Sequence, residues 1–340
     1  MEAVSADRSL NRLLPLLRLA LWGTPLPSGD LAEMSFYRQE DWDSLLSFAR
    51  EQTVIGLLYR AVDLLPDEVE IPSETLLQLI GAADWIRRGN RSIARVSEPL
   101  LRDLREQGFH PVVLKGSVCA ARYPQPELRE SGDIDLYLPP GEFDAAVGFL
   151  EKDGRSMAAA PDRSCHFSID GIDIDLHRHY FDLHVRKDRL PPIPSPEAEL
   201  LMLSAHIRKH AMGTGVGLRQ CCDFATAAAS CQIAPESLIC LYQRTGTFRW
   251  NRLLYAFLEE AFHLPSPLPK TDSAPLRKIV LQGGNFGHHA SSRNLELQAA
   301  PLRRKAGTAR RLLGNLPFSL RYAPREAFPM LWVLARGNLK

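Results

Sequence analysis

Two acidic residues, Asp133 and Asp135, have the type and spacing needed to bind a divalent cation. One apolar residue separates them, so a strand would place both carboxylates on the same face. Two carboxylates held this close repel each other unless a cation lies between them. Oxygen ligands at this spacing favour Mg²⁺ or Mn²⁺ over zinc. The alternative is an exposed strand edge whose acids serve only solubility.

A second acidic segment follows about forty residues later and reads Asp-Ile-Asp-Leu-His-Arg-His over residues 173–179. Alternation in a strand would place four of these side chains on one face, namely Asp173, Asp175, His177 and His179. A neighbouring strand could therefore bring one of the two aspartates beside the first acidic pair.

Two features near the first acidic pair suit phosphate. Lys115, Gly116 and Ser117 stand where a predicted strand ends and a helix begins, a place where backbone N–H groups can bind a phosphate. A plain strand-to-helix turn would equally explain the Gly-Ser pair. Arg129, four residues before Asp133, could offset phosphate charge, although an isolated arginine would be interpreted as a surface residue.

The helical region downstream adds His206 and His210, one helical turn apart and so on one face. No glutamate follows His206, as the zinc peptidase motif would require. A buried, hydrogen-bonded histidine pair is the favoured interpretation, and contact with a nucleotide or an acceptor is the alternative. Asp223 follows Arg219 by four residues, which predicts an ion pair that supports a helix.

The elements that must position these residues change type twice along the chain. Helical periodicity dominates residues 8–105, where residues 73–107 predict one helix or two because Gly89 and Pro99 weaken continuity. Short strands and helices then alternate, giving β-α-β-α-β-β, with strands predicted at 110–116, 133–138, 164–168 and 172–179 and helices at 117–122 and 141–152. Helices return at 197–210, 216–232 and 236–262.

The prediction is an α+β chain, divided into a helical domain (1–108), an α/β unit (109–190), a second helical domain (191–300) and a basic segment (301–340).

Charge and composition narrow the function classes. The 340 residues contain 41 Lys and Arg against 40 Asp and Glu, so net charge favours neither a nucleic-acid nor a membrane partner. Residues 301–340 hold nine basic residues and one acid, which is +8, and the preceding 300 residues therefore sum to −7. A solvated basic face on an acidic body is the favoured interpretation, and a docking surface for an anionic acceptor is the alternative.

Secretion and membrane insertion are not expected. No apolar run approaches the roughly 20 residues that cross a bilayer. Arg12 and Arg18 interrupt the apolar N-terminal stretch, which predicts an amphipathic helix rather than a signal peptide. The six cysteines lack zinc-site spacing and are expected to be reduced. We therefore expect a cytoplasmic protein.

The ordered set of motifs resembles a known family. Glycine-serine, a short helix, Asp133-Ile-Asp135 and a later acidic strand are similar to the nucleotidyltransferase fold of the DNA polymerase β superfamily. The closer resemblance is to the uncharacterised bacterial nucleotidyltransferase family, members of which occur beside genes for peptide natural products, including lasso peptides. It extends over about residues 10–290 and is carried by residues 42–49, 112–117, 129–135, 175–177 and 206–223.

The resemblance implies a small nucleotidyltransferase palm between helical domains. In it, Gly116 and Ser117 would hold a triphosphate, and Asp133 and Asp135 would bind two metal ions. Asp175 matches the third carboxylate because Leu-His follows it, and Asp173 is the second choice. This chain departs from the family pattern at two places. The 15 residues between Ser117 and Asp133 suggest a looser or extended nucleotide lid, and Arg178 stands where the family often has an aromatic residue.

We therefore expect an Mg²⁺- or Mn²⁺-dependent enzyme that moves a nucleotidyl group from a nucleoside triphosphate, such as ATP, to a hydroxyl or phosphate. Lys115, Ser117 and Arg129 would offset phosphate charge. The acceptor is open, with a peptide or a small molecule suggested by the family and a nucleic acid not expected. The alternatives are phosphoryl or glycosyl transfer to a peptide on the same fold, and a non-catalytic antitoxin-like or peptide-binding module. The intact set of three carboxylates counts against the non-catalytic module.

Overall fold

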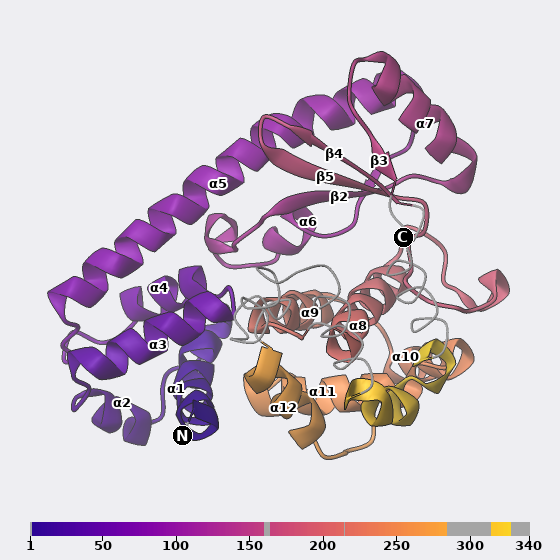
Figure 1. The fold of residues 1–340 in the computed structure, drawn as a ribbon. Helices are drawn as coiled ribbons and strands as arrows, with labels where there is room; N and C mark the ends of the chain where they lie inside the picture. Colours follow the sequence, from indigo (N-terminus) through magenta and orange to yellow (C-terminus); the bar gives the residue numbers. More distant parts are fainter. Residues whose placement is uncertain (1, 160–163, 214, 284–313, 328–340) are drawn as a thin grey trace.

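The computed structural model describes residues 2–159, 164–213, 215–283 and 314–327 (Figure 1). Helices make up most of these residues, and a five-stranded sheet lies between the N-terminal and C-terminal helices. The chain is therefore α+β, as the sequence predicts.

The N-terminal helices are amphipathic and pack against one another. They are α1 (Glu2–Trp22), α2 (Ser28–Met34), α3 (Gln39–Glu51) and α4 (Ile55–Asp63). The apolar positions of α1 at Leu10, Leu13 and Leu17 are fully buried, and α1 lies against α3 and α4. Burial of these apolar stripes supplies most of the stability of such helices.

Helix α5 (Ser73–Glu106) joins the N-terminal helices to the sheet. It is one continuous helix of 34 residues, so the choice that Gly89 and Pro99 left open is settled in favour of one helix. Its first half contacts α3 and α4, and its second half buries Val96, Leu100 and Leu104 beside the sheet (Figure 1). Packing at both ends compensates for the backbone hydrogen bond that Pro99 cannot donate.

The sheet has the order β1-β2-β5-β4-β3. Its strands are β1 (Val112–Val113), β2 (Asp133–Tyr137), β3 (Ala158–Ala159), β4 (Cys165–Ile169) and β5 (Ile172–His177). β2 and β5 are parallel, and the other neighbouring strands are antiparallel. β3 was not predicted because its alanines carry no alternating pattern. Between the strands lie α6 (Ser117–Ala120), the 3₁₀ turn η1 (Pro126–Leu128) and α7 (Pro140–Lys152).

The sheet has one apolar face and one polar face because its central strands alternate. Ile134, Leu136, Ile174 and Leu176 are buried in a hydrophobic cluster with residues of α5 and α7. The acids of β2 and β5 occupy the alternate positions and so lie on the opposite face. Helix α8 (Pro196–Met212) covers this polar face, as its residues in the cavity described below show.

The C-terminal helices follow a 3₁₀ turn, η2 (Lys187–Arg189). They are α8, α9 (Leu218–Ser230), α10 (Pro235–Thr245), α11 (Phe248–Phe262) and α12 (Ala274–Gly283), with further helical turns at 314–322 and 324–327. The single helix predicted at 236–262 is wrong. Gly246 adopts a left-handed conformation (φ 73°) that ends α10, and α11 starts two residues later.

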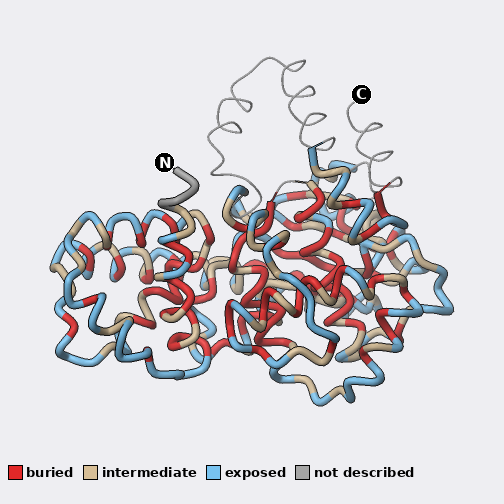
Figure 2. The backbone as a smooth tube through the Cα atoms, turned by 90° about the horizontal axis from the view of Figure 1, so that it is seen from below, coloured by how far each residue is buried: buried red, intermediate tan, exposed pale blue. Residues whose placement is uncertain are grey.

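The N-terminal and C-terminal helices share one hydrophobic cluster. Arg18 of α1 donates hydrogen bonds to the carbonyls of Glu260 and Ala261, at 2.9 and 3.0 Å, and Trp22 donates to the carbonyl of Phe262 at 3.0 Å. Figure 2 shows buried backbone running through both groups of helices. The division of the chain at residues 108, 190 and 300 stays a prediction.

Two expectations about cysteines and membranes can be compared with the described residues. The six cysteines are free, and Cys119, Cys221 and Cys222 are buried. Among the helices of the described ranges, none combines the length and apolar character that a membrane span requires.

Candidate active site

Parallel pairing of β2 and β5 brings the two acidic segments together. Asp133 lies opposite Asp173 and Asp135 lies opposite Asp175 in the register. Asp135 is 6% exposed, Asp175 is half-buried, and Asp133 and Asp173 are exposed. The register thus gathers four carboxylates on one face of the sheet.

Asp135 is the centre of a charged triad. Its Oδ2 lies 3.0 Å from Lys115 Nζ, and its Oδ1 lies 2.7 Å from His177 Nε2. Burial would raise the pKa of Asp135, but the charge of Lys115 and the hydrogen bond with His177 hold it well below its usual range. The same pairing raises the pKa of Lys115 against the lowering effect of burial. The lysine ammonium thus supplies the cation that the close carboxylates require.

Asp133 is in a different electrostatic position. Loss of surrounding water raises the pKa of its carboxyl, and the negative charge of Asp135 raises it further. Lys115 opposes both effects without reversing them. Asp133 is therefore the carboxylate that would gain most from a second cation.

Asp175 has a histidine partner on the neighbouring antiparallel strand. His166 of β4 lies opposite Asp175, and its Nδ1 is hydrogen-bonded to Asp175 Oδ1. The other ring nitrogen of His166 lies 3.2 Å from Ser164 Oγ. The ring is therefore held at both ends, so it orients the carboxylate of Asp175.

One set of side chains on this face could hold a metal ion. Ligand atoms of Asp135, Asp175 and His177 all lie within 4.8 Å of one another. The alternation in the sequence places His177 on this face but does not identify it as a metal ligand. Its position two residues after Asp175, on the same side of the strand, is the feature of the sequence that could have indicated this role. Asp133, a predicted ligand, and Asp173, the second choice for the third carboxylate, lie outside this set.

A cavity of about 230 Å³ opens between the acidic face and α8. The residues that line it include Asp133, Asp135, Asp175, His166 and His177 from the sheet, His179 just after β5, Lys115, and Met202, His206, Lys209 and His210 from α8. Asp173 is not among the lining residues. The cavity therefore has acids on the sheet side and two histidines and a lysine on the α8 side.

His206 and His210 contact each other as their spacing predicts. Their ring centroids are 4.5 Å apart, and the rings meet edge to face. Burial, followed by the charge of Lys115, lowers the pKa of His206 well below its usual range and that of His210 to about 3. Both imidazoles are therefore neutral near pH 7.

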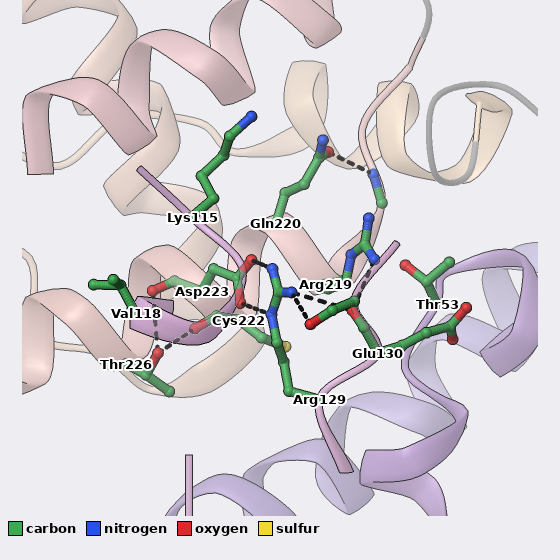
Figure 3. A network of polar contacts seen from close by, with 12 residues as sticks. Thr53, Lys115, Val118, Arg129, Glu130, Arg219, Gln220, Cys222, Asp223 and Thr226 are labelled. Carbon is green, nitrogen blue, oxygen red and sulfur yellow. Dashed lines mark hydrogen bonds and ion pairs between the residues drawn. The ribbon is translucent and has the colours of Figure 1, made fainter. Parts of the chain in front are cut away.

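Arg129 lines a smaller cavity, described below, together with Lys115 and Gly116, and is paired with an acid there. Its Nε and Nη2 donate to the two carboxylate oxygens of Asp223, at 3.0 and 2.7 Å, as Figure 3 shows. Tyr123 donates to the same carboxylate at 2.7 Å. The predicted ion pair between Arg219 and Asp223 is therefore replaced by one with Arg129, and Arg219 instead donates to the carbonyl of Glu130 at 2.8 Å.

These contacts also correct the expected lid between Ser117 and Asp133. The interval contains α6 and η1, and Tyr123, Leu128 and Arg129 within it are buried. Part of the interval is therefore packed into the protein, while Ala121, Pro124 and Glu127 in it are exposed. Arg178 stands where the family often has an aromatic residue. Its guanidinium carbon lies 4.4 Å from the ring centroid of Phe143, so it covers an aromatic ring.

The predicted phosphate turn lies beside the acids. Gly116 has φ 62°, a conformation that favours glycine, and Ser117 begins α6. A second cavity, of about 40 Å³, is lined by Gly116, Arg219 and Gln220 and shares Lys115, Asp133, Asp135 and His206 with the first. Ser117 is exposed and lines neither of these two cavities.

Comparison with known proteins identifies the family. No significant match to the chain was found among curated proteins or solved structures. Residues 38–263, more than half of the chain, match the model of a family described as uncharacterised nucleotidyltransferase. The matched range contains the sheet, the acidic face and α8 and α9. The chain belongs to the uncharacterised nucleotidyltransferase family.

Proposed function

We propose that this protein transfers a nucleotidyl group from a nucleoside triphosphate to a hydroxyl or phosphate acceptor. The oxygen of the acceptor would attack the α-phosphorus, and pyrophosphate would leave. The sheet would serve as the nucleotidyltransferase palm, and the cavity between its acidic face and α8 would be the reaction site. The family membership of the chain supports the reaction class.

The residues around Asp135 fit a divalent cation. The donor set contains two carboxylates and an imidazole, and Asp133 stands beside it with a pKa that a neighbouring cation would lower. Asp133, Asp135 and Asp175 would hold Mg²⁺ or Mn²⁺, with His177 at the edge of the set. When bound, the metal supplies charge for the phosphates and activation of the nucleophile.

The remaining side chains would bind and orient the substrates. Lys115 lies between the two cavities, so its ammonium can turn from Asp135 to a phosphate oxygen when the carboxylate gains another cation. Asp175, oriented by His166, would accept the proton of the acceptor hydroxyl. His206 and His210, neutral and half-buried, would close the cavity to water and contact the nucleotide.

One observation carries the proposal: Asp133, Asp135 and Asp175 open together into a cavity that also contains Lys115. The test is to incubate the protein with Mg²⁺ or Mn²⁺, each α-labelled nucleoside triphosphate and candidate peptide or small-molecule acceptors. Transfer of the α-label to the acceptor is the expected result. Transfer of a γ-label instead would show phosphoryl transfer, and failure to bind any triphosphate would contradict the proposal.

A further inference from the structure

We propose that Arg219 and Gln220, in the first turn of α9, form a phosphate-binding subsite for the polyphosphate of the donor. The inference rests on the proposed function and deepens it. Arg129 was expected to bind phosphate, but both carboxylate oxygens of Asp223 already accept its hydrogen bonds. Arg129 lines the smaller cavity in this paired state, so donors there that are not already paired would bind the phosphates together with Lys115.

The cavity of about 40 Å³ places this pair beside the predicted triphosphate turn. Gly116 and Lys115 line it together with Arg219 and Gln220, and Asp133 connects it to the acidic site. In Figure 3, Gln220 lies between Lys115 and Arg219. A ligand that spans both cavities would therefore reach the metal-binding carboxylates at one end and Arg219 at the other.

Arg219 is a cation with no acid at ion-pair distance among the described residues. Its Nη1 donates to the carbonyl of Glu130, and its Nε is buried without a hydrogen-bond partner in the described part of the chain. No carboxylate of the described residues forms an ion pair with it. Burial, followed by the charge of Arg129, lowers its pKa, and the carboxylates of Asp223, Glu130 and Asp133, which lie beyond ion-pair distance, offset only part of that effect. An anion in the cavity would supply that counter-ion.

Gln220 is a second unpaired donor at the same place. Its side chain is 5% exposed, and its Oε1 accepts a hydrogen bond from the backbone N–H of Gly217 at 3.2 Å. Its Nε2 is buried and has no partner among the residues that the structure describes. An unsatisfied buried donor costs about 1–3 kcal/mol, so this amide gains from an acceptor such as a phosphate oxygen.

The backbone N–H groups that start α9 are already engaged, so side chains must do the binding. Leu218 N–H donates to Gln52 Oε1 at 3.0 Å, and Arg219 N–H donates to the carbonyl of Gln52 at 3.3 Å. Gln52 is itself fixed, because its Nε2 donates to the carbonyl of Val280 at 3.2 Å. The subsite is therefore the guanidinium and the amide rather than the helix end.

Phosphate oxygens fit this set of donors, and they could come from a donor polyphosphate or from a phosphorylated acceptor. Gly116 and Lys115 favour the donor, because they belong to the predicted triphosphate turn. Of the three acids that line this cavity, Asp223 is paired with Arg129 and Asp135 with Lys115, which leaves Asp133 as the carboxylate that a bound cation would have to offset.

Binding of inorganic tripolyphosphate to the full-length protein tests the proposal, measured by calorimetry with and without Mg²⁺. Arg219→Gln is expected to weaken binding by about tenfold or more, because it removes a charged, two-pronged donor. The control is Arg244→Gln, which removes the same charge from an exposed arginine in the last turn of α10 and should leave binding unchanged.

Gln220→Glu is the decisive second variant. The new carboxylate keeps an oxygen for the N–H of Gly217 but replaces the free amide donor with a negative charge. We expect about tenfold weaker binding or worse at an unchanged melting temperature. This variant keeps the hydrogen bond from the N–H of Gly217, so it can test phosphate binding at the subsite even if Arg219→Gln does not fold.

The outcomes separate this inference from the proposed function. If Gln220→Glu binds tripolyphosphate as tightly as the wild-type protein does, the proposed subsite is wrong. If the same variant also binds nucleoside triphosphate, the proposed function is not contradicted. A wild-type protein that binds no nucleoside triphosphate contradicts both. A loss of affinity confined to a phosphoserine peptide assigns the subsite to the acceptor and overturns its assignment to the donor.

Discussion

At the residue scale, Asp133 and Asp135 differ although their spacing makes them look alike. Asp135 is buried against Lys115 and His177, whereas Asp133 is exposed, and the repulsion from Asp135 and the loss of water outweigh its attraction to Lys115. The sequence alone favours the expectation that either Ala variant leaves the fold intact or stabilised. Because Lys115 contacts Asp135, we expect an intact or stabilised fold only for the Ala variant of Asp133.

We predict that Asp135→Ala lowers the free energy of unfolding by about 1–3 kcal/mol, because Lys115 loses its counter-ion. Asp133→Ala should keep or raise stability, since it removes a charge that Asp135 repels. Both variants should lose Mg²⁺-dependent triphosphate binding. Chemical denaturation and calorimetry measure the two effects, and equal stability of the two variants would contradict the difference in environment.

The depressed pKa of Asp135 also fixes the sign of a pH effect. A carboxyl with a lowered pKa in the folded state stabilises the protein above the unfolded pKa, near 4 for aspartate. That contribution disappears as the pH falls through the folded pKa, which is far below its usual range. Asp135→Ala should therefore flatten the loss of stability below about pH 4.

Asp175 and Asp173 form a matched pair for testing the third carboxylate. Asp175 lines the cavity and is oriented by His166, whereas Asp173 is exposed and lies outside the cavity lining. We predict that Asp175→Asn removes transfer but keeps much of the triphosphate affinity, and that Asp173→Asn does less. Steady-state rates together with equilibrium binding would show the opposite order if the choice is wrong.

At the element scale, strand periodicity was enough to predict the acidic face, because alternation alone places Asp133 with Asp135 and Asp175 with His177. The parallel register that joins the two pairs depends on strand order, which periodicity does not contain. Arg129 shows the limit most clearly. Its partner Asp223 lies 94 residues away on α9, so local sequence could not distinguish a phosphate ligand from a buried ion pair.

Helix α4 approaches the turn η1 closely at Gly56, and a substitution there tests this packing. A Cβ added at Gly56 would lie 2.1 Å from the carbonyl oxygen of Leu128, the residue before Arg129. Backbone must move to relieve such a contact, so Gly56→Ala should lower the free energy of unfolding by about 1–3 kcal/mol. The melting temperature and urea denaturation measure the loss.

Gly148 of α7 is the control for this substitution. A Cβ there meets nothing within 4 Å, so Gly148→Ala should be neutral or stabilising by up to about 1 kcal/mol through helix propensity. If both alanines are tolerated equally, α4 and η1 are not packed as closely as described.

At the scale of the whole molecule, the sequence left two roles open for the basic segment 301–340, structural packing and binding of the acceptor. Residues 314–327 pack on the C-terminal helices, with Ala323 and Ala327 buried beside Met212 and the Phe318 ring centroid 6.4 Å from that of Trp250. The aromatic residues Phe328 and Trp332 and the basic residues of the segment except Arg321 and Arg325 lie outside the described residues. The acceptor role of the segment stays a prediction.

Glu326, the one acid of this segment, joins it to the rest of the protein. Its Oε1 accepts a hydrogen bond from the backbone N–H of His184 at 3.0 Å, and its Oε2 lies 2.6 Å from His184 Nδ1. Arg208 of α8 lies 3.7 Å away, and its Nε has no partner among the described residues. The carboxylate is thus the counter-ion of a buried arginine on the helix that roofs the cavity.

We predict that Glu326→Ala lowers the free energy of unfolding by about 1–3 kcal/mol, because Arg208 stays buried without its acid. Glu326→Gln should recover part of that loss, since it still accepts from the N–H of His184. Truncation after Ala300 removes the same contact and the apolar packing, so it should destabilise more than either variant. A truncated protein that keeps its melting temperature but loses transfer would instead assign the segment to acceptor binding, because the loss would then be independent of stability.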